Sequence, residues 1–230
     1  MLYNITLKVL FVASLASAAA IPALSFEHIN MSIHAREAGA TAEAQLLQIA
    51  PTSDSCAGAA FADECATAAE AAPFLIEAMS TYKIHTAPEM AAVLSLIAFE
   101  SGDFQFAKNH FPAPGRPGQG TRNMQMANYN LQYAASIAEL KAPLAAITTA
   151  TSTEGLSDDD LNAIRALVLD DRYSWASAAW FLTTQCAPEV RTALQAGGQS
   201  GFDAYMGCIG TSATEDRLAY WKRANTAFGL

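Results

Sequence analysis

Residues 86–102 read TAPEMAAVLSLIAFESG, and this stretch predicts a helix with two marked ends. Thr86 and Glu89 have capping-box spacing, and the proline between them is tolerated in a first turn, where amide groups lack intrahelical acceptors. Apolar residues recur at the i, i+3, i+4, i+7 spacing of a core-facing stripe, and Gly102 can adopt the left-handed conformation that ends a helix. We therefore expect an apolar helix that ends at Glu100.

Glu100 lies at the edge of the apolar stripe, where a surface glutamate would not normally be found. Apolar neighbours and the negative end of the helix macrodipole both disfavour its charged form, so we expect its pKa to be raised. A carboxylic acid that stays protonated near neutral pH can act as a general acid. The alternative is a half-buried structural glutamate, held by an arginine or by backbone amides.

The rest of the sequence predicts an all-α fold, because no segment shows persuasive strand-like alternation. Three prolines and three glycines after Asn109 predict a loop that can form one wall of a cleft. Further helices are expected within 24–49, within 56–80 with a break at Pro73, at 122–140, after Ser157, at about 175–185, at 188–196 and after Ser212.

The first 20 residues have the pattern of a secretory signal peptide. One lysine precedes a short apolar run, and Ala16-Ser17-Ala18 forms an A-x-A-type cleavage site. No later segment is apolar for the roughly 18 residues that a membrane span needs. We expect residues 1–20 to be removed, and residues 21–230 to form a single secreted, extracellular domain.

Four cysteines, an even number in a secreted chain, predict two disulfides. Of the three possible pairings we prefer Cys56 with Cys65 and Cys186 with Cys208. The cysteines lack the close Cys-x-x-Cys spacing of zinc sites, and the four histidines form no metal-binding motif. We therefore expect no metal and no cofactor.

The net charge of −9 makes nucleic acid and anionic membranes improbable partners, because both are bound chiefly through lysine and arginine. The charge is compatible with a neutral or cationic polymer. We expect the protein to be a monomer.

Three segments in this order resemble the lysozyme-like superfamily: Ala98-Phe99-Glu100-Ser101-Gly102, then Asn123-Met124-Gln125, then the aromatic helix start at Tyr173 to Trp175. Soluble lytic transglycosylases and goose-type lysozymes have the most similar pattern, and secreted fungal muramidases also look similar. The resemblance covers residues 86–182 and implies a lysozyme-like helical domain. Arg122-Asn123 departs from the Gly-Leu of the family, and the loop before it is longer.

The resemblance implies a muramidase, a glycosidase that cleaves β-1,4 bonds of peptidoglycan, with Glu100 protonating the leaving oxygen. A second carboxylate would lie about 5–5.5 Å away in a retaining enzyme or about 6.5–9.5 Å away in an inverting one. Asp171 and Asp170 are slightly better candidates than Asp103. Goose-type lysozymes and transglycosylases manage without an obvious second carboxylate, so the resemblance does not require one.

Five residues are the candidates for substrate binding. Ser101 matches the polar residue beside the family's acid, while Gln125 and Tyr129 would orient substrate or water. Tyr173 and Trp175 offer flat faces on which a sugar ring can stack.

Several alternatives remain open at this point. The sequence does not decide between a hydrolase and a transglycosylase. The enzyme can be a chitosanase or chitinase instead, and the negative charge mildly favours chitosan. A non-catalytic secreted protein that binds the cell wall is also compatible. In every case the expected partner is an amino-sugar polysaccharide of the cell wall.

Overall fold

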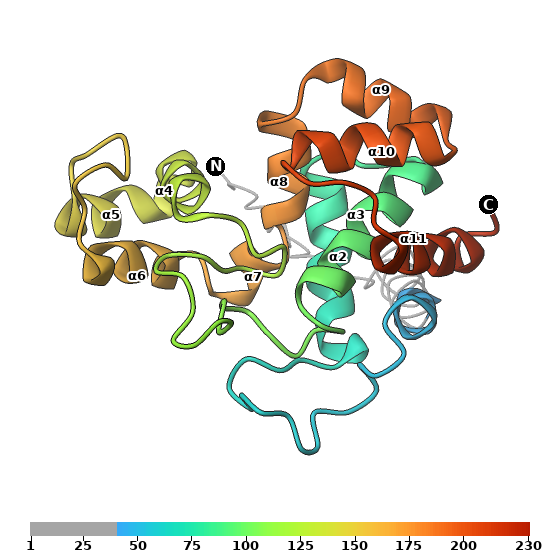
Figure 1. Cartoon of the computed structure of the whole chain (residues 1–230), viewed down its shortest axis with the longest axis horizontal. Helices are drawn as coiled ribbons and strands as arrows, with labels where there is room; N and C mark the ends of the chain where they lie inside the picture. The colour runs from blue at the N-terminus through green and yellow to red at the C-terminus, as the bar shows by residue number, and fades with distance from the viewer. Residues whose placement is uncertain (1–40) are drawn as a thin grey trace, which may run out of the picture. The chain divides into compact units, whose positions relative to one another are not determined.

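The computed structural model describes residues 41–230, which lie within one compact unit, Arg36–Leu230. The predicted signal peptide lies outside the described residues. Helices and loops make up the described chain and no strand occurs in it, which confirms the all-α class (Figure 1). Residues 41–49 are helical, and the elements that follow are α2 (Ala68–Thr81), α3 (Ala87–Glu100), α4 (Ala127–Ser136), the 3-10 turn η1 (Ala138–Leu140), α5 (Lys141–Ile147), α6 (Asp158–Leu167), α7 (Asp171–Ser174), α8 (Ser177–Thr184), α9 (Pro188–Ala196), α10 (Gln199–Cys208) and α11 (Glu215–Ala227).

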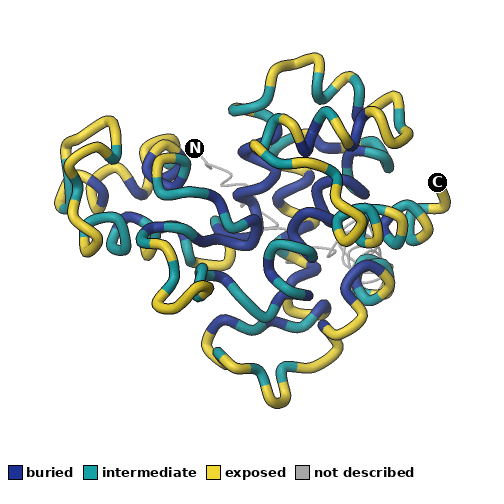
Figure 2. Tube along the Cα trace, viewed as in Figure 1, coloured by how far each residue is buried: buried dark blue, intermediate teal, exposed yellow. Residues whose placement is uncertain are grey.

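Helix α3 is the predicted apolar helix, and it begins and ends where the sequence indicates. The side chain of Thr86 accepts a hydrogen bond from the Glu89 amide, and Ser101 is the C-cap. Every residue from Ala91 to Ala98 is buried, because α3 packs against α8, α9 and α11 (Figure 2). A helix that is apolar on all sides needs such neighbours around its whole circumference.

Two hydrophobic cores organise the described residues. The first surrounds α3 and takes side chains from α2, α9, α10 and α11. The second lies among α4, α5 and α6, which form a group of their own beside it (Figure 1). Helix α8 belongs to both, since Ala178, Ala179 and Leu182 face the first core while Trp180 and Phe181 face the second.

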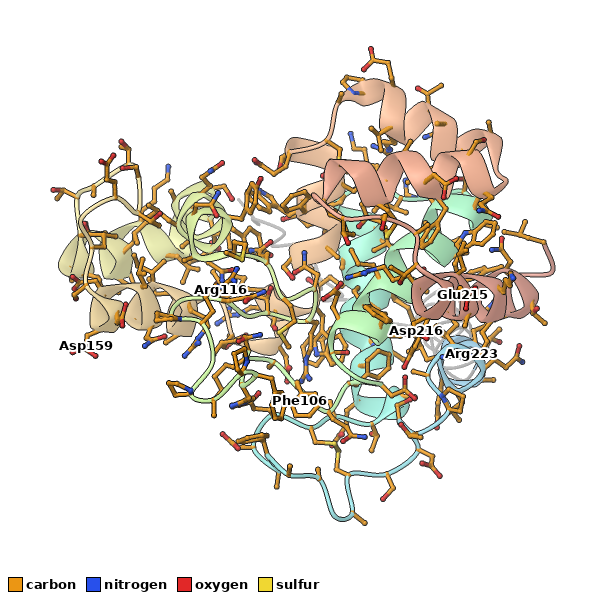
Figure 3. All side chains as sticks on the ribbon, viewed as in Figure 1. Phe106, Arg116, Asp159, Glu215, Asp216 and Arg223 are labelled. Atoms are coloured by element: carbon orange, nitrogen blue, oxygen red, sulfur yellow. A yellow bond between two sulfur atoms is a disulfide. The ribbon has the colours of Figure 1, made fainter. Side chains whose placement is uncertain are left out.

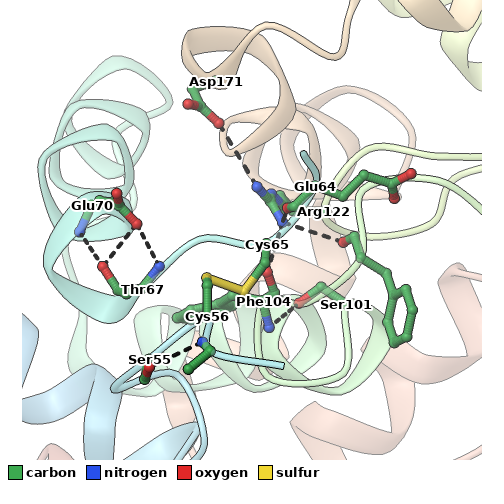
Figure 4. Close-up of a disulfide and its surroundings, with 12 residues drawn as sticks. Ser55, Cys56, Glu64, Cys65, Thr67, Glu70, Ser101, Phe104, Arg122 and Asp171 are labelled. Atoms are coloured by element: carbon green, nitrogen blue, oxygen red, sulfur yellow. Dashed lines mark hydrogen bonds and ion pairs between the residues drawn. A yellow bond between two sulfur atoms is a disulfide. The ribbon is translucent and has the colours of Figure 1, made fainter. Parts of the chain in front are cut away.

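Both predicted disulfides are present. Cys56 and Cys65 close the loop that precedes α2, with their Cα atoms 5.8 Å apart (Figure 4). Cys186 and Cys208 connect the chain after α8 to the end of α10, at a Cα separation of 5.6 Å. These distances lie in the ordinary range for disulfides.

Several predicted helix boundaries were wrong. Pro73 does not divide two helices: α2 starts at Ala68 and continues through the proline, and its buried face offsets the lost hydrogen bond. The last helix is capped by Thr214, whose side chain accepts a hydrogen bond from the Arg217 amide, rather than by Ser212. Helix α10 was not predicted.

The helix expected from Arg122 begins only at Ala127, because the preceding residues form a compact loop. Thr121 and Met124 have positive φ values of 65° and 49°, which no helix accommodates. Gly120 forms isolated β-bridges to Lys108 and to Gln125. Residues 121–125 therefore form a loop instead of a helical turn. Asn123, Met124 and Gln125 of this loop line the pocket described below.

Candidate functional site

Glu100 opens onto a pocket of about 270 Å³ between the C-terminal end of α3, the start of α4 and the first turn of α11. Gln125 and Tyr129 line the same pocket, as the sequence predicts, and Arg217 lines it from α11. Glu100 is the one carboxylate that the described residues contribute to this lining. None of the candidate second carboxylates reaches it.

Arg217 holds Glu100 in an ion pair. Its Nη2 atom donates to Oε1 of Glu100 at 2.9 Å, and the two side chains are only 18% and 21% exposed. The guanidinium also lies over the Phe99 ring, 4.5 Å from its centroid. Burial raises the pKa of Glu100, and the hydrogen bond and charge of Arg217 partly oppose this rise. The raised pKa of Glu100 agrees with the prediction from the sequence. The ion pair with Arg217 agrees with the alternative interpretation, in which Glu100 is a structural residue held by an arginine.

Gln125 and Tyr129 are fixed by their neighbours. Nε2 of Gln125 donates to Oδ1 of Asn130 at 2.7 Å, while its Oε1 is buried and has no partner among the described residues. The Tyr129 ring packs edge-on against Phe181, with ring centroids 4.6 Å apart. Both side chains are thus positioned at the pocket by contacts with neighbouring residues.

Ser101 and Asp103 are buried away from this pocket. The hydroxyl of Ser101 donates to the Ile97 carbonyl at 2.6 Å and accepts from the Phe104 amide at 3.0 Å, which satisfies the end of α3. Oδ2 of Asp103 accepts from the amide and hydroxyl of Thr52, and Oδ1 accepts from the Tyr220 hydroxyl at 2.7 Å. The Ser101 contacts are local, whereas those of Asp103 connect segments distant in sequence, and neither side chain lines the Glu100 pocket.

Asp170 and Asp171 line a different pocket, of about 580 Å³, together with Glu64 and Arg122. Asp170 caps α7 and pairs with Arg172 at 3.0 Å. Oδ1 of Asp171 accepts from the indole nitrogen of Trp175 at 2.9 Å and lies 3.9 Å from Nη2 of Arg122 (Figure 4). Each aspartate is therefore engaged by a local partner.

The two candidate stacking aromatics do not share a surface with Glu100. Trp175 is fully buried, with Phe104 edge-on at 5.1 Å and the guanidinium of Arg122 4.2 Å from its ring centroid. Tyr173 lines a third pocket and carries the Arg172 guanidinium over its ring, at 4.8 Å. A core tryptophan has no face on which a sugar can stack.

Two arginines that sequence reasoning missed organise this region. Arg217 is 117 positions from Glu100, and nothing in its local sequence marks it. Arg122 is 4% exposed and donates from Nη1 to the carbonyls of Glu64 and Phe104, at 2.8 and 3.0 Å. Burial lowers the pKa of Arg122 to about 10. The one signal in the sequence was that Arg122 stands where the motif of the lysozyme-like superfamily has glycine.

A separate pocket of about 390 Å³, called the apolar pocket below, lies between residues 41–49, α2, the start of α3 and Phe228. Its polar side chains belong to Gln45, Ser80 and His85. The buried part of its wall consists of apolar side chains that are at most 8% exposed, namely Leu46, Ala72, Leu75, Met79, Ile84 and Leu94. At the mouth Ile76 is 42% exposed. Four separate segments create this pocket, and nothing in the local sequence of any one of them predicts it.

In residues 41–230, no group of three or more histidine, cysteine, aspartate or glutamate side chains is arranged to hold a metal ion. No helix in that range has the length and apolar character to cross a bilayer.

The chain is similar to a fungal enzyme. It is 50% identical over 162 residues to a bifunctional dioxygenase (DOX)-epoxy alcohol synthase (EAS) of Fusarium oxysporum (strain Fo5176). The aligned segment comprises 70% of this chain but 12% of the length of the relative. No family model matches the chain, and no solved structure matches it. The resemblance to the lysozyme-like superfamily stays a prediction.

This relative contradicts the expected function and partner. Its name describes a dioxygenase and a synthase of epoxy alcohols, not an enzyme that hydrolyses glycosidic bonds. The predictions of a muramidase acting on peptidoglycan, of a chitosanase or chitinase, and of a cell-wall-binding protein are therefore wrong.

Proposed function

We propose that this chain binds an amphiphilic aliphatic molecule of the epoxy alcohol class in the apolar pocket. The observation that carries the proposal is the pocket of about 390 Å³ with an apolar wall and a few polar groups. Its volume falls within the range of roughly 300–1,000 Å³ that is usual for small-molecule sites. An epoxy alcohol has the matching composition, because it joins an apolar carbon chain to two oxygen functions.

The burial of the lining residues gives the ligand a direction. Leu46, Leu75 and Ile84 are 1–3% exposed and form the apolar wall, against which the carbon chain would lie. Ser80 and His85 are exposed, so they mark the side that faces solvent, where a hydroxyl or epoxide oxygen finds hydrogen-bond partners. Each buried methylene contributes about 0.8 kcal/mol, which is roughly a fourfold gain in affinity.

The relative is an enzyme, and this supports a role for the chain within enzymatic oxidation. The chain aligns with 12% of that protein, so we assign to it one task, which is to hold the aliphatic reactant or product. The oxidising step itself is left to other parts of such an enzyme.

The test is isothermal titration calorimetry with the full chain and a series of linear epoxy alcohols of increasing chain length. We expect saturable binding that tightens about fourfold per added methylene until the pocket is full. Ile76→Glu places a charge at the mouth and should weaken binding at least tenfold. Phe111→Glu is the matched control, because Phe111 is also an exposed apolar side chain, at 68%, and does not line this pocket.

Two results would contradict the proposal. One is the absence of saturable binding for every chain length. The other is equal affinity of the wild type and Ile76→Glu, which would place the ligand elsewhere on the protein.

We also propose that the protein is secreted. The two disulfides support this, because disulfides persist in oxidising compartments. Expression in a fungal host and mass spectrometry of the culture medium would test it: the expected product begins shortly after Ala18. Retention of the intact chain inside the cell would contradict it.

A further inference from the structure

A further pocket, of about 300 Å³ and lined mainly by polar and charged residues, lies between the loop 108–117 and helix α6. Arg116 extends from this loop beside the α4–α6 group (Figure 3). Arg165 reaches the pocket from the third turn of α6. This pocket shares no lining residue with the apolar pocket or with the Glu100 pocket.

The charge of this pocket is opposite to that of the whole chain. The chain carries −9, but the pocket is lined by two arginines, Lys108 and His110 against one carboxylate, the exposed Asp158. Lys108 and His110 are both engaged by Oε1 of Glu64, each at 2.8 Å. Within the described residues neither arginine has an ion-pair partner. Each guanidinium therefore lacks a direct ion pair with residues 41–230, although Asp158 lines the same pocket and the charge of Glu64 acts on Arg165.

Arg165 is held in place although its guanidinium is incompletely satisfied. Its aliphatic stem lies against Gly120, where an added Cβ would approach Cδ of Arg165 to 2.7 Å. Nη1 donates to the Gln119 carbonyl at 3.3 Å, while Nε is buried and has no acceptor in the described structure. Burial lowers the pKa of Arg165, and an anion beside it would oppose that effect.

Two asparagines add neutral donors to the pocket. Oδ1 of Asn109 accepts from the Arg116 amide at 2.8 Å, and Oδ1 of Asn162 accepts from the Gly118 amide at 3.0 Å. A backbone N–H can only donate, so these contacts fix which end of each side-chain amide is oxygen. The two NH₂ groups remain as donors, and neither has an acceptor among the described residues. The pocket is thus rich in donors and poor in acceptors.

We propose that this pocket binds an oxyanion, either a carboxylate or a phosphate group. Arg116 and Arg165 supply the positive charge, and planar guanidinium groups suit both anions because they can donate two parallel hydrogen bonds. Asn109 and Asn162 add uncharged donors. The site is independent of the apolar pocket, so the failure of one proposal leaves the other standing.

Calorimetric titration of the full chain with inorganic phosphate and with acetate tests this site, at an ionic strength held constant with sodium chloride. We expect saturable binding of one anion per chain. Arg116→Gln and Arg165→Gln should each weaken it at least tenfold. Arg172→Gln is the matched control and should change affinity less than twofold, since Arg172 is exposed on α7, pairs with Asp170 and lies outside this pocket.

The two anions separate the possible ligand chemistries. Tighter binding of phosphate identifies a phosphate group as the natural ligand, and tighter binding of acetate identifies a carboxylate. The proposal is overturned if neither anion binds more than chloride does, or if both arginine variants bind as the wild type does. Arg116 is exposed, so Arg116→Gln remains informative even if Arg165→Gln does not fold.

Discussion

The ion pair between Glu100 and Arg217 should act as a structural link between α3 and α11, and a double-mutant cycle can measure it. The perturbations are Glu100→Gln, Arg217→Gln and the two together. The atoms are 2.9 Å apart and about four-fifths of each side chain is removed from water. At an effective dielectric constant of about 20 the attraction is roughly 6 kcal/mol, but each charge loses several kcal/mol of hydration.

A hydrogen bond between charged groups typically retains about 1.5–3 kcal/mol net, so we expect a coupling energy of about 2 kcal/mol. Urea unfolding followed by circular dichroism gives the free energy of unfolding of all four proteins. The free energy of unfolding of each single variant should fall by more than the coupling energy, because the remaining charged partner is left partly buried without its counterion. The double variant should be more stable than the sum of the single losses implies.

The pH dependence of Arg217→Gln provides a second readout. Burial already raises the pKa of Glu100 above the unfolded value of 4.5, so the folded state binds the proton more tightly than the unfolded state. Such a group stabilises the fold below pH 4.5 and loses this contribution as pH rises through its folded pKa. Without Arg217 that pKa rises further. Arg217→Gln should therefore be more destabilised at pH 7 than at pH 5.

Additive single effects, with a coupling energy below about 0.5 kcal/mol, would refute the structural role of this pair. Equal losses for Arg217→Gln at both pH values would refute the assignment of the raised pKa to Glu100.

Three further predictions concern stability, and urea unfolding measures all of them. Arg122→Lys should lower the free energy of unfolding by about 3 kcal/mol, because lysine keeps a buried charge but reaches fewer carbonyls. Arg122→Met should lower it less, since methionine removes the desolvated charge, and the reverse order would contradict this view. Replacing both Cys186 and Cys208 by alanine should cost about 3 kcal/mol for a loop of 22 residues, and an unchanged midpoint would count against it. Gly201→Ala should cost about 1–3 kcal/mol, because the new Cβ would lie 2.4 Å from the Ala193 carbonyl oxygen; a stabilised variant would show that α9 and α10 separate easily.

The elements that could be predicted from the sequence are those marked by local chemistry. Thr86 and Gly102 mark the ends of α3, and Ser157 marks the start of α6, because capping and turn preferences depend on neighbouring residues. The raised pKa of Glu100 followed from its position at the end of an apolar helix. Helix α10 was missed because Gly201 weakens the local helical signal, although close packing against α9 requires a glycine there.

The candidate site was less predictable because its partners are distant in sequence. Arg217 meets Glu100 across 117 positions, and Arg122 meets the Glu64 carbonyl across 58. Local sequence does not distinguish an aromatic that faces a cleft from one that fills a core, and Trp175 does the latter. The same limit applies to the candidate site: an ordered set of motifs suggested that Glu100, Asp171 and Trp175 act together, but the two carboxylates line different pockets and Trp175 is buried.

Helix α8 contributes to both hydrophobic cores, and this limits how the protein can open. A fluctuation that frees Trp180 from one core also disturbs Ala179 in the other, so neither group of helices has a boundary at which it can separate alone. The disulfide after α8 further restricts such a separation. Amide protons within α8 should therefore exchange with solvent only through global unfolding, as the slowest in the chain. A protease that cuts an exposed loop between α5 and α6 would leave two fragments that stay associated.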